Sequence, residues 1–139
     1  MMTETSVYKH QLPSKLESLV EVEKIVDDLK EEFQIPEEIY GNILVSLSEA
    51  TNNAIKHGNK LDPNKIITLS FLPEKNKFTF SISDEGKGFD YSDIPDPTHP
   101  DNIDKPDGRG IFIMKNLADE VEFIDNGKEI KLVFHRLTI

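Results

Sequence analysis

The chain has 139 residues, of which 26 are acidic and 16 are basic, so its formal net charge is −10. This length suits one domain with its own core, and we expect residues 1–139 to form a single domain. The negative charge and the absence of a basic cluster in the sequence disfavour direct contact with nucleic acid or an anionic membrane. The sequence has no cysteine, which excludes disulfides and thiolate metal sites. We read no secretory signal or membrane-spanning run, so we expect a cytoplasmic protein.

The predicted elements begin with a short edge strand at Ser6–Leu12, followed by two helices. Apolar residues spaced by threes and fours from Leu16 to Phe33 predict the first helix. The second is predicted from Pro36 to about His57, with Gly58 as its C-terminal cap. Its apolar stripe consists of Ile39, Ile43, Leu47, Ala50 and Ala54.

The rest of the chain is predicted to be mainly β. Alternating apolar residues indicate two pairs of strands, each joined by a turn. Helices therefore precede hairpin-linked strands, an order that favours an α+β fold. We expect a two-layer sandwich, in which helices cover one face of a mixed, mainly antiparallel sheet. The predicted elements are strands at Lys65–Leu72 and Lys77–Ser83, a loop at Asp84–Gly110, a short helix at Ile111–Leu117, and strands at Glu120–Asp125 and Glu129–Leu137.

Glu49 and Asn53 are four residues apart on the second predicted helix. Their side chains should therefore point to the same side, next to the apolar stripe. One interpretation is that both are exposed and flank a core helix, as most Glu and Asn residues do. The alternative is a polar site, in which Asn53 offers a carbonyl oxygen to Mg²⁺ and Glu49 acts as a general base.

Two Gly-x-Gly pairs flank the long predicted loop. Gly86 and Gly88 follow Asp84 at the end of a strand, where they indicate either a plain turn or a close approach to a ligand. The carboxylate of Asp84 can accept a hydrogen bond from an exocyclic amine, which would select adenine over guanine. Gly108 and Gly110 open onto a predicted helix, whose unpaired N–H groups suit phosphate oxygens. A simple loop-to-helix junction is the alternative.

Residues 90–107, between the two glycine pairs, include four prolines and six aspartates. A segment of this length without regular structure is usually functional or disordered. It is therefore either a lid that closes over a ligand or a flexible insertion.

Taken in order, these motifs resemble those of the GHKL ATPase superfamily, and within it the anti-sigma factor serine/threonine kinases. The motifs are Glu-x-x-x-Asn on a helix, Asp-x-Gly-x-Gly after a strand, a lid, and Gly-x-Gly at the start of a helix. The resemblance covers nearly the whole chain and is most specific at residues 49–58 and 108–121. It implies a Bergerat-type ATP-binding fold with an ATP lid at about residues 90–107. The acidic composition of this segment differs from the Gly- and Thr-rich lids of the family.

The resemblance implies that ATP and Mg²⁺ are the cofactors. Asn53 would bind Mg²⁺, and Glu49 would be the base that activates a hydroxyl group. The four-residue separation from Glu49 favours Asn53 over Asn52 for this role. Asp84 would accept the adenine amine. The residues expected near the base are Gly86 and Gly88, and those expected near the phosphates are Gly108 and Gly110. Arg109 occupies a position that is often apolar in the family, and its guanidinium is a further candidate contact to phosphate.

The implied function is that of a protein-serine/threonine kinase. It would phosphorylate an anti-sigma-factor antagonist, sequester a sigma factor and form a homodimer. An ATP-binding partner-switch module without kinase activity and a simple ATPase are the alternatives. His57 is expected to bond to backbone at the helix end rather than to accept phosphate, because the chain has no room for a separate phosphoacceptor domain.

Overall fold

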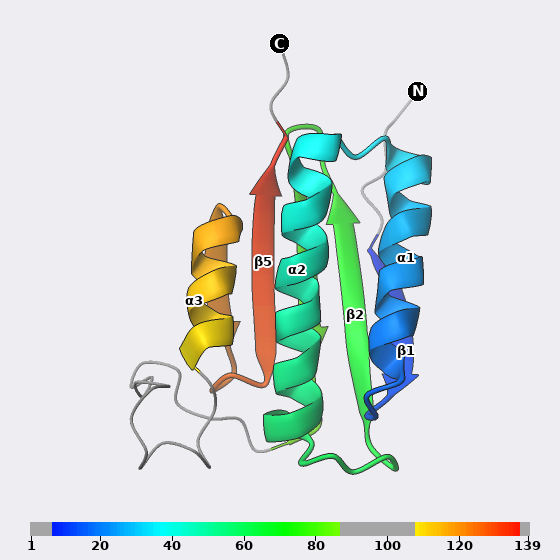
Figure 1. Cartoon of the computed structure of the whole chain (residues 1–139), viewed down its shortest axis with the longest axis vertical. Helices are drawn as coiled ribbons and strands as arrows, with labels where there is room; N and C mark the ends of the chain where they lie inside the picture. Colours follow the sequence, from blue (N-terminus) through cyan, green and yellow to red (C-terminus); the bar gives the residue numbers. More distant parts are fainter. Residues whose placement is uncertain (1–6, 87–107, 137–139) are drawn as a thin grey trace.

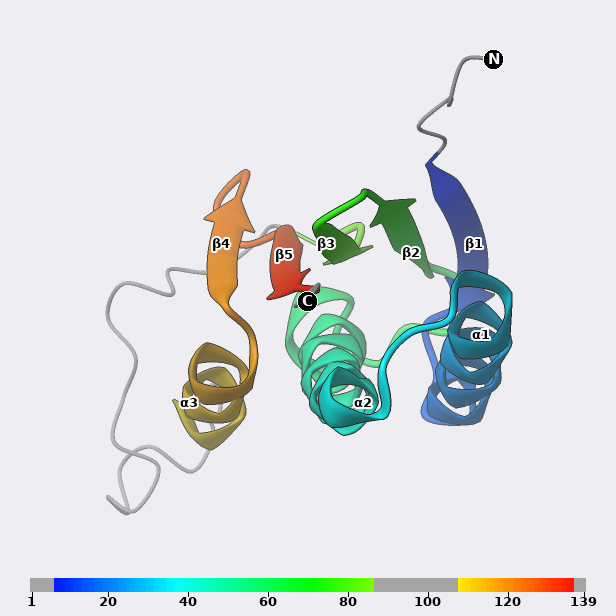
Figure 2. The ribbon, with the colours of Figure 1, turned by 90° about the horizontal axis from the view of Figure 1, so that it is seen from above.

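A computed structural model describes residues 7–86 and 108–136 of the chain, and in these residues helices cover one face of an antiparallel sheet (Figures 1 and 2). None of the helices in these two ranges is long and apolar enough to cross a membrane. The elements are β1 (Tyr8–Pro13), α1 (Ser18–Phe33), α2 (Glu37–Asn53), the π-helical turn η1 (Ala54–Gly58), β2 (Ile66–Pro73), β3 (Lys77–Ser83), α3 (Gly108–Leu117), β4 (Glu120–Ile124) and β5 (Glu129–His135).

The sheet has the strand order β1-β2-β3-β5-β4. Tight turns join β2 to β3 and β4 to β5, so each of these pairs is antiparallel. Two consecutive helices return the chain from β1 to β2, which makes that pair antiparallel as well. The predicted α+β class and the predicted edge strand are confirmed. Within the described ranges the sheet is wholly antiparallel rather than mixed.

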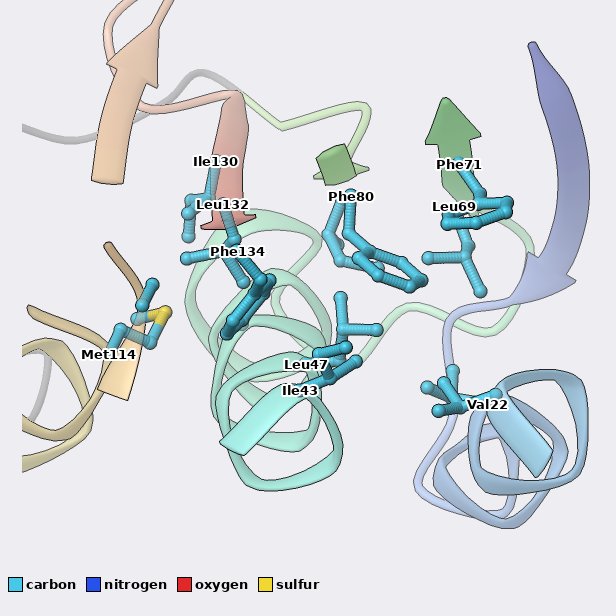
Figure 3. Packing of buried hydrophobic residues seen from close by; sticks show 14 of the residues in the cluster. Val22, Ile43, Leu47, Leu69, Phe71, Phe80, Met114, Ile130, Leu132 and Phe134 are labelled. Carbon is cyan, nitrogen blue, oxygen red and sulfur yellow. The ribbon is translucent and has the colours of Figure 1, made fainter. Parts of the chain in front are cut away.

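The core lies between the helices and the covered face of the sheet (Figure 3). The predicted stripe, which runs along α2 and into η1, is confirmed, because Ile43, Leu47 and the two alanines are buried and Ile39 is partly buried. Opposite this stripe lie the buried aromatic side chains of the sheet, and each large apolar side chain contributes about 1.5–3 kcal/mol on burial. The fully buried ones are Phe71, Phe78, Phe80 and Phe134.

Two predicted helix ends were wrong. The short helix α3 begins at Gly108, not at Ile111. Glycine has a low helix propensity, so the pattern alone does not place it inside a first turn. Gly58 is the last residue of η1 and does not adopt the left-handed conformation of a glycine cap. The chain turns instead through Lys60 and Leu61, whose φ angles are 57° and 59°.

The C-terminal end of α2 and the start of α3 lie at the same end of the molecule (Figure 1). The two helices are in extensive contact, and β3 also ends there. The fold therefore brings three sequence motifs to one end of the sheet.

Candidate nucleotide site

Glu49 and Asn53 face the first turn of α3. A Cβ atom built on Gly110 would lie 2.9 Å from Oε1 of Glu49 and 3.8 Å from Nδ2 of Asn53. The lack of a side chain at Gly110 therefore leaves room for the Glu49 carboxylate, whereas the Asn53 amide lies at ordinary van der Waals distance from this position. Asn53 is only 4% exposed, so the interpretation in which both side chains are exposed on a core helix is wrong. Glu49 is partly buried.

The amide of Asn53 has unused hydrogen-bonding capacity. Its Nδ2 atom is buried and has no hydrogen-bond partner within the described part of the chain. A buried polar atom without a partner costs about 1–3 kcal/mol, and in native proteins such an atom calls for an explanation, such as a catalytic role or a bound water or ion. The Asn53 amide is therefore consistent with a group that gains a partner when a ligand binds.

These residues fit Mg²⁺ only together with an anionic ligand. Carboxylate and amide oxygens suit this hard cation, which typically takes one or two protein oxygens and completes its shell with water and phosphate. In residues 7–86 and 108–136 there is no group of three or more His, Asp or Glu side chains that could hold a metal. Asn53 and Glu49 could thus contribute to a magnesium site completed by a nucleotide.

Asp84 lies directly against the end of the second helix. Its N–H donates to the carbonyl oxygen of Lys128 at 2.9 Å, and its Oδ1 accepts from the N–H of Gly86 at 2.8 Å. A Cβ atom on Gly58 would lie 2.2 Å from Oδ2 of Asp84, and one on Gly86 would lie 1.8 Å from the carbonyl oxygen of Gly58. Both glycines are therefore required for this close packing.

Burial raises the pKa of the Asp84 carboxyl group, because desolvation disfavours the charged form. The N–H of Gly86 and the charges of Lys128 and Lys65 lower this pKa and offset part of the effect. The ionised carboxylate is thus incompletely solvated. It would gain from one more hydrogen-bond donor, such as an exocyclic amine.

The remaining predicted residues divide into two groups. Gly108 and the exposed Arg109 lie in the first turn of α3, next to Gly110. Gly88 and the predicted lid at residues 90–107 lie outside the described residues.

The contact of Gly58 with Asp84 was not predicted from the sequence, because the expected helix cap already explained a glycine at this position. The available signal in the sequence was the position of Gly58 at the end of a polar helical segment, where a close contact with another segment also favours glycine.

The family described as histidine kinase-like ATPase domain matches residues 12–134. The anti-sigma F factor of Anoxybacillus flavithermus is 32% identical over 96 residues, which cover 64% of this chain and 64% of the relative. The anti-sigma F factor of Geobacillus stearothermophilus is 39% identical over 79 residues, covering 54% and 53%. The serine-protein kinase RsbW of Staphylococcus aureus is 37% identical over 84 residues, covering 55% and 53%. The chain thus matches between about half and two thirds of the length of these relatives.

Proposed function

Because the chain belongs to the histidine kinase-like ATPase domain family, we propose that it is an anti-sigma factor that acts as a protein-serine/threonine kinase. It transfers the γ-phosphoryl group of ATP to a serine of an anti-sigma-factor antagonist, and it also binds a sigma factor. Relatives named anti-sigma F factor and serine-protein kinase support this assignment. The observation that carries it is the meeting of Glu49, Asn53 and Gly110, from two separate helices, at one end of the sheet.

Asp84 selects the base in this proposal. Its carboxylate accepts a hydrogen bond from the exocyclic amine of adenine, whereas guanine presents a carbonyl oxygen at the equivalent position. Two acceptors facing each other would repel, so ATP is preferred over GTP. The close packing of Gly58 and Gly86 around Asp84 supports this role, because it holds the carboxylate in one position. Gly88 is proposed to let the chain pass close to the base.

The phosphates lie at the start of α3 in this proposal. Its first N–H groups have no partner within the helix and carry the positive end of the helix dipole, which favours anions. Gly108, Arg109 and Gly110 would contribute these groups, with the Arg109 guanidinium as a further donor. Asn53 would hold Mg²⁺ through its side-chain oxygen. When bound, this ion neutralises charge on the phosphates.

Glu49 is the proposed general base. As the serine Oγ of the antagonist forms a bond to the γ-phosphorus, Glu49 accepts the proton of that hydroxyl group. The bond between the γ-phosphorus and the bridging oxygen breaks, and ADP leaves. The partly buried position of Glu49 beside Gly110 supports this role, because it lies next to the helix start proposed for the phosphates.

The proposal extends to the arrangement of the protein. We propose that residues 1–139 form one ATPase domain, that residues 90–107 close over the nucleotide, and that the protein acts in the cytoplasm as a homodimer. Size-exclusion chromatography with light scattering tests the dimer.

Phosphoryl transfer tests the proposed activity. The purified protein is incubated with Mg²⁺, ATP labelled at the γ-phosphate and a candidate antagonist, and phosphorylated residues are mapped by mass spectrometry. Phosphoserine on the antagonist is the expected result. Release of ADP without a phosphoprotein would mean a simple ATPase, and ATP binding without turnover would mean a partner-switch module. Either result would contradict the kinase assignment.

A further inference from the structure

The fully buried Asn59 joins three segments of the chain. Its Nδ2 donates to the carbonyl oxygen of Ile66 at 3.0 Å, and its Oδ1 accepts from the N–H of Glu85 at 2.8 Å. Oε1 of Glu85 in turn accepts from the N–H of Ile66 at 2.7 Å. These three hydrogen bonds form a closed ring between the end of η1, the start of β2 and the residue that follows Asp84.

The ring takes the place of an Ile66–Glu85 pair, which would be the second pair beyond the end of the β2–β3 ladder. The ladder pairs Thr68 with Ser83, so the same register would bring Ile66 opposite Glu85. The amide of Asn59 instead stands between these two residues and provides the donor and acceptor that a facing strand would supply. The Asn59 amide therefore separates the main chain after β3 from the start of β2. Asp84 lies at the point where these two strands separate.

We propose that Asn59 is a positioning residue for nucleotide recognition: its inserted amide fixes the main chain just after Asp84 and thereby directs the Asp84 carboxylate toward the base. The inference rests on the proposed function, because it takes Asp84 as the group that reads adenine. The hydrogen bond from Asp84 to Lys128 fixes the main chain on the other side. Loss of the Asn59 amide should therefore release one of the two main-chain hydrogen bonds that flank the Asp84 side chain.

The backbone around Asn59 indicates that its position is strongly constrained. Its own N–H donates to the carbonyl oxygen of Ala54 at 2.8 Å, a bond that closes the π-helical turn. Single π turns within α-helices are frequent at functional sites. The next two residues, Lys60 and Leu61, have left-handed φ angles, each at a cost of about 1–2 kcal/mol. Such conformations persist where the surroundings over-determine them.

Nucleotide selectivity separates positioning from a purely structural role. Asn59→Ala is compared with wild type and with Asn64→Ala, a matched control whose exposed side chain lies on the same connection. Calorimetric titrations with Mg-ATP and with Mg-GTP give the affinity and the stoichiometry of each protein. We expect Asn59→Ala to keep full stoichiometry, to lose about ten-fold in ATP affinity and to lose less than three-fold in GTP affinity. Asn64→Ala should match wild type.

A second pair of variants keeps the test decisive if Asn59→Ala fails to fold. Glu85→Ala removes the bond to Ile66 at an exposed side chain, whereas Glu85→Gln retains an acceptor at Oε1. Glu85→Ala should lose about two- to three-fold in the ratio of ATP to GTP affinity, and Glu85→Gln should restore it.

The outcomes also separate this inference from the proposed function. A wild-type protein that does not bind ATP, or that binds GTP equally well, would contradict the proposed function itself. If wild type discriminates but the Asn59 and Glu85 variants discriminate equally well, only the positioning role is wrong. Equal losses for ATP and GTP, or a loss of stoichiometry alone, would also overturn it.

Discussion

Substitution of Gly58 by alanine should disrupt base recognition without changing any group that contacts the nucleotide. The new Cβ atom would lie 2.2 Å from Oδ2, 2.4 Å from Cγ and 2.8 Å from Oδ1 of Asp84. Ordinary van der Waals contact requires the carboxylate to retreat by roughly 1 Å. The side chain is short and its Oδ1 is bonded to Gly86, so this displacement breaks an existing hydrogen bond.

The expected loss of ATP affinity follows from the hydrogen bond that the displaced Asp84 carboxylate can no longer accept from the adenine amine. A hydrogen bond to a charged group contributes about 1.5–3 kcal/mol, so Gly58→Ala should weaken ATP binding by roughly 10- to 150-fold. Isothermal titration calorimetry measures this change. Gly41→Ala, in the preceding helix α2, is the control, since a Cβ there meets nothing within 4 Å. It should stabilise the fold by about 0.5–1 kcal/mol and leave ATP affinity unchanged. Wild-type ATP affinity in Gly58→Ala would refute the reasoning.

Three further predictions address single groups of the site. Glu49→Gln should keep Mg-ATP affinity within a few-fold and slow phosphoryl transfer by about 10² or more, as single-turnover kinetics would reveal. Asn53→Ala should lose the Mg²⁺-dependent part of ATP affinity, whereas Asn52→Ala should retain it; identical titrations for the two variants would exclude Asn53 as the magnesium ligand. Because burial raises the pKa of Asp84, the contribution of this residue to the free energy of unfolding should fall as pH rises from about 3.9 through the raised folded pKa. Asp84→Asn lacks this titration, so its melting temperature should rise relative to that of the wild type over this pH range. A difference in melting temperature that stays constant with pH would contradict burial as the cause of the raised Asp84 pKa. The ATP affinity of Asp84→Asn should fall at least ten-fold.

Local periodicity predicted the order and type of the elements and the side of the second helix that carries the candidate site residues. The stripe through Ile43 and Leu47 follows from helical spacing, and the same spacing puts Glu49 and Asn53 on one side. These properties depend only on residues within a few positions of one another, so the sequence contains them directly.

Contacts between distant segments could not be predicted in this way. The approach of Gly110 to Glu49 depends on how α3 packs against α2, and the approach of Gly58 to Asp84 depends on where β3 ends. The same packing explains the wrong boundary of α3, because close contact with Glu49 favours glycine within the first helical turn despite its low propensity. The hydrogen-bond ring of Asn59 was missed for a similar reason, since an amide at a helix end has many local uses.

A crystal structure of the protein with Mg²⁺ and a non-hydrolysable ATP analogue tests the central claim most directly. We expect the exocyclic amine of adenine to lie about 2.7–3.2 Å from the Asp84 carboxylate. We also expect the side-chain oxygen of Asn53 to lie about 2.1 Å from the metal ion, with the γ-phosphate next to Glu49. A nucleotide bound elsewhere, or bound here with its amine turned away from Asp84 and its metal ion away from Asn53, would contradict the account.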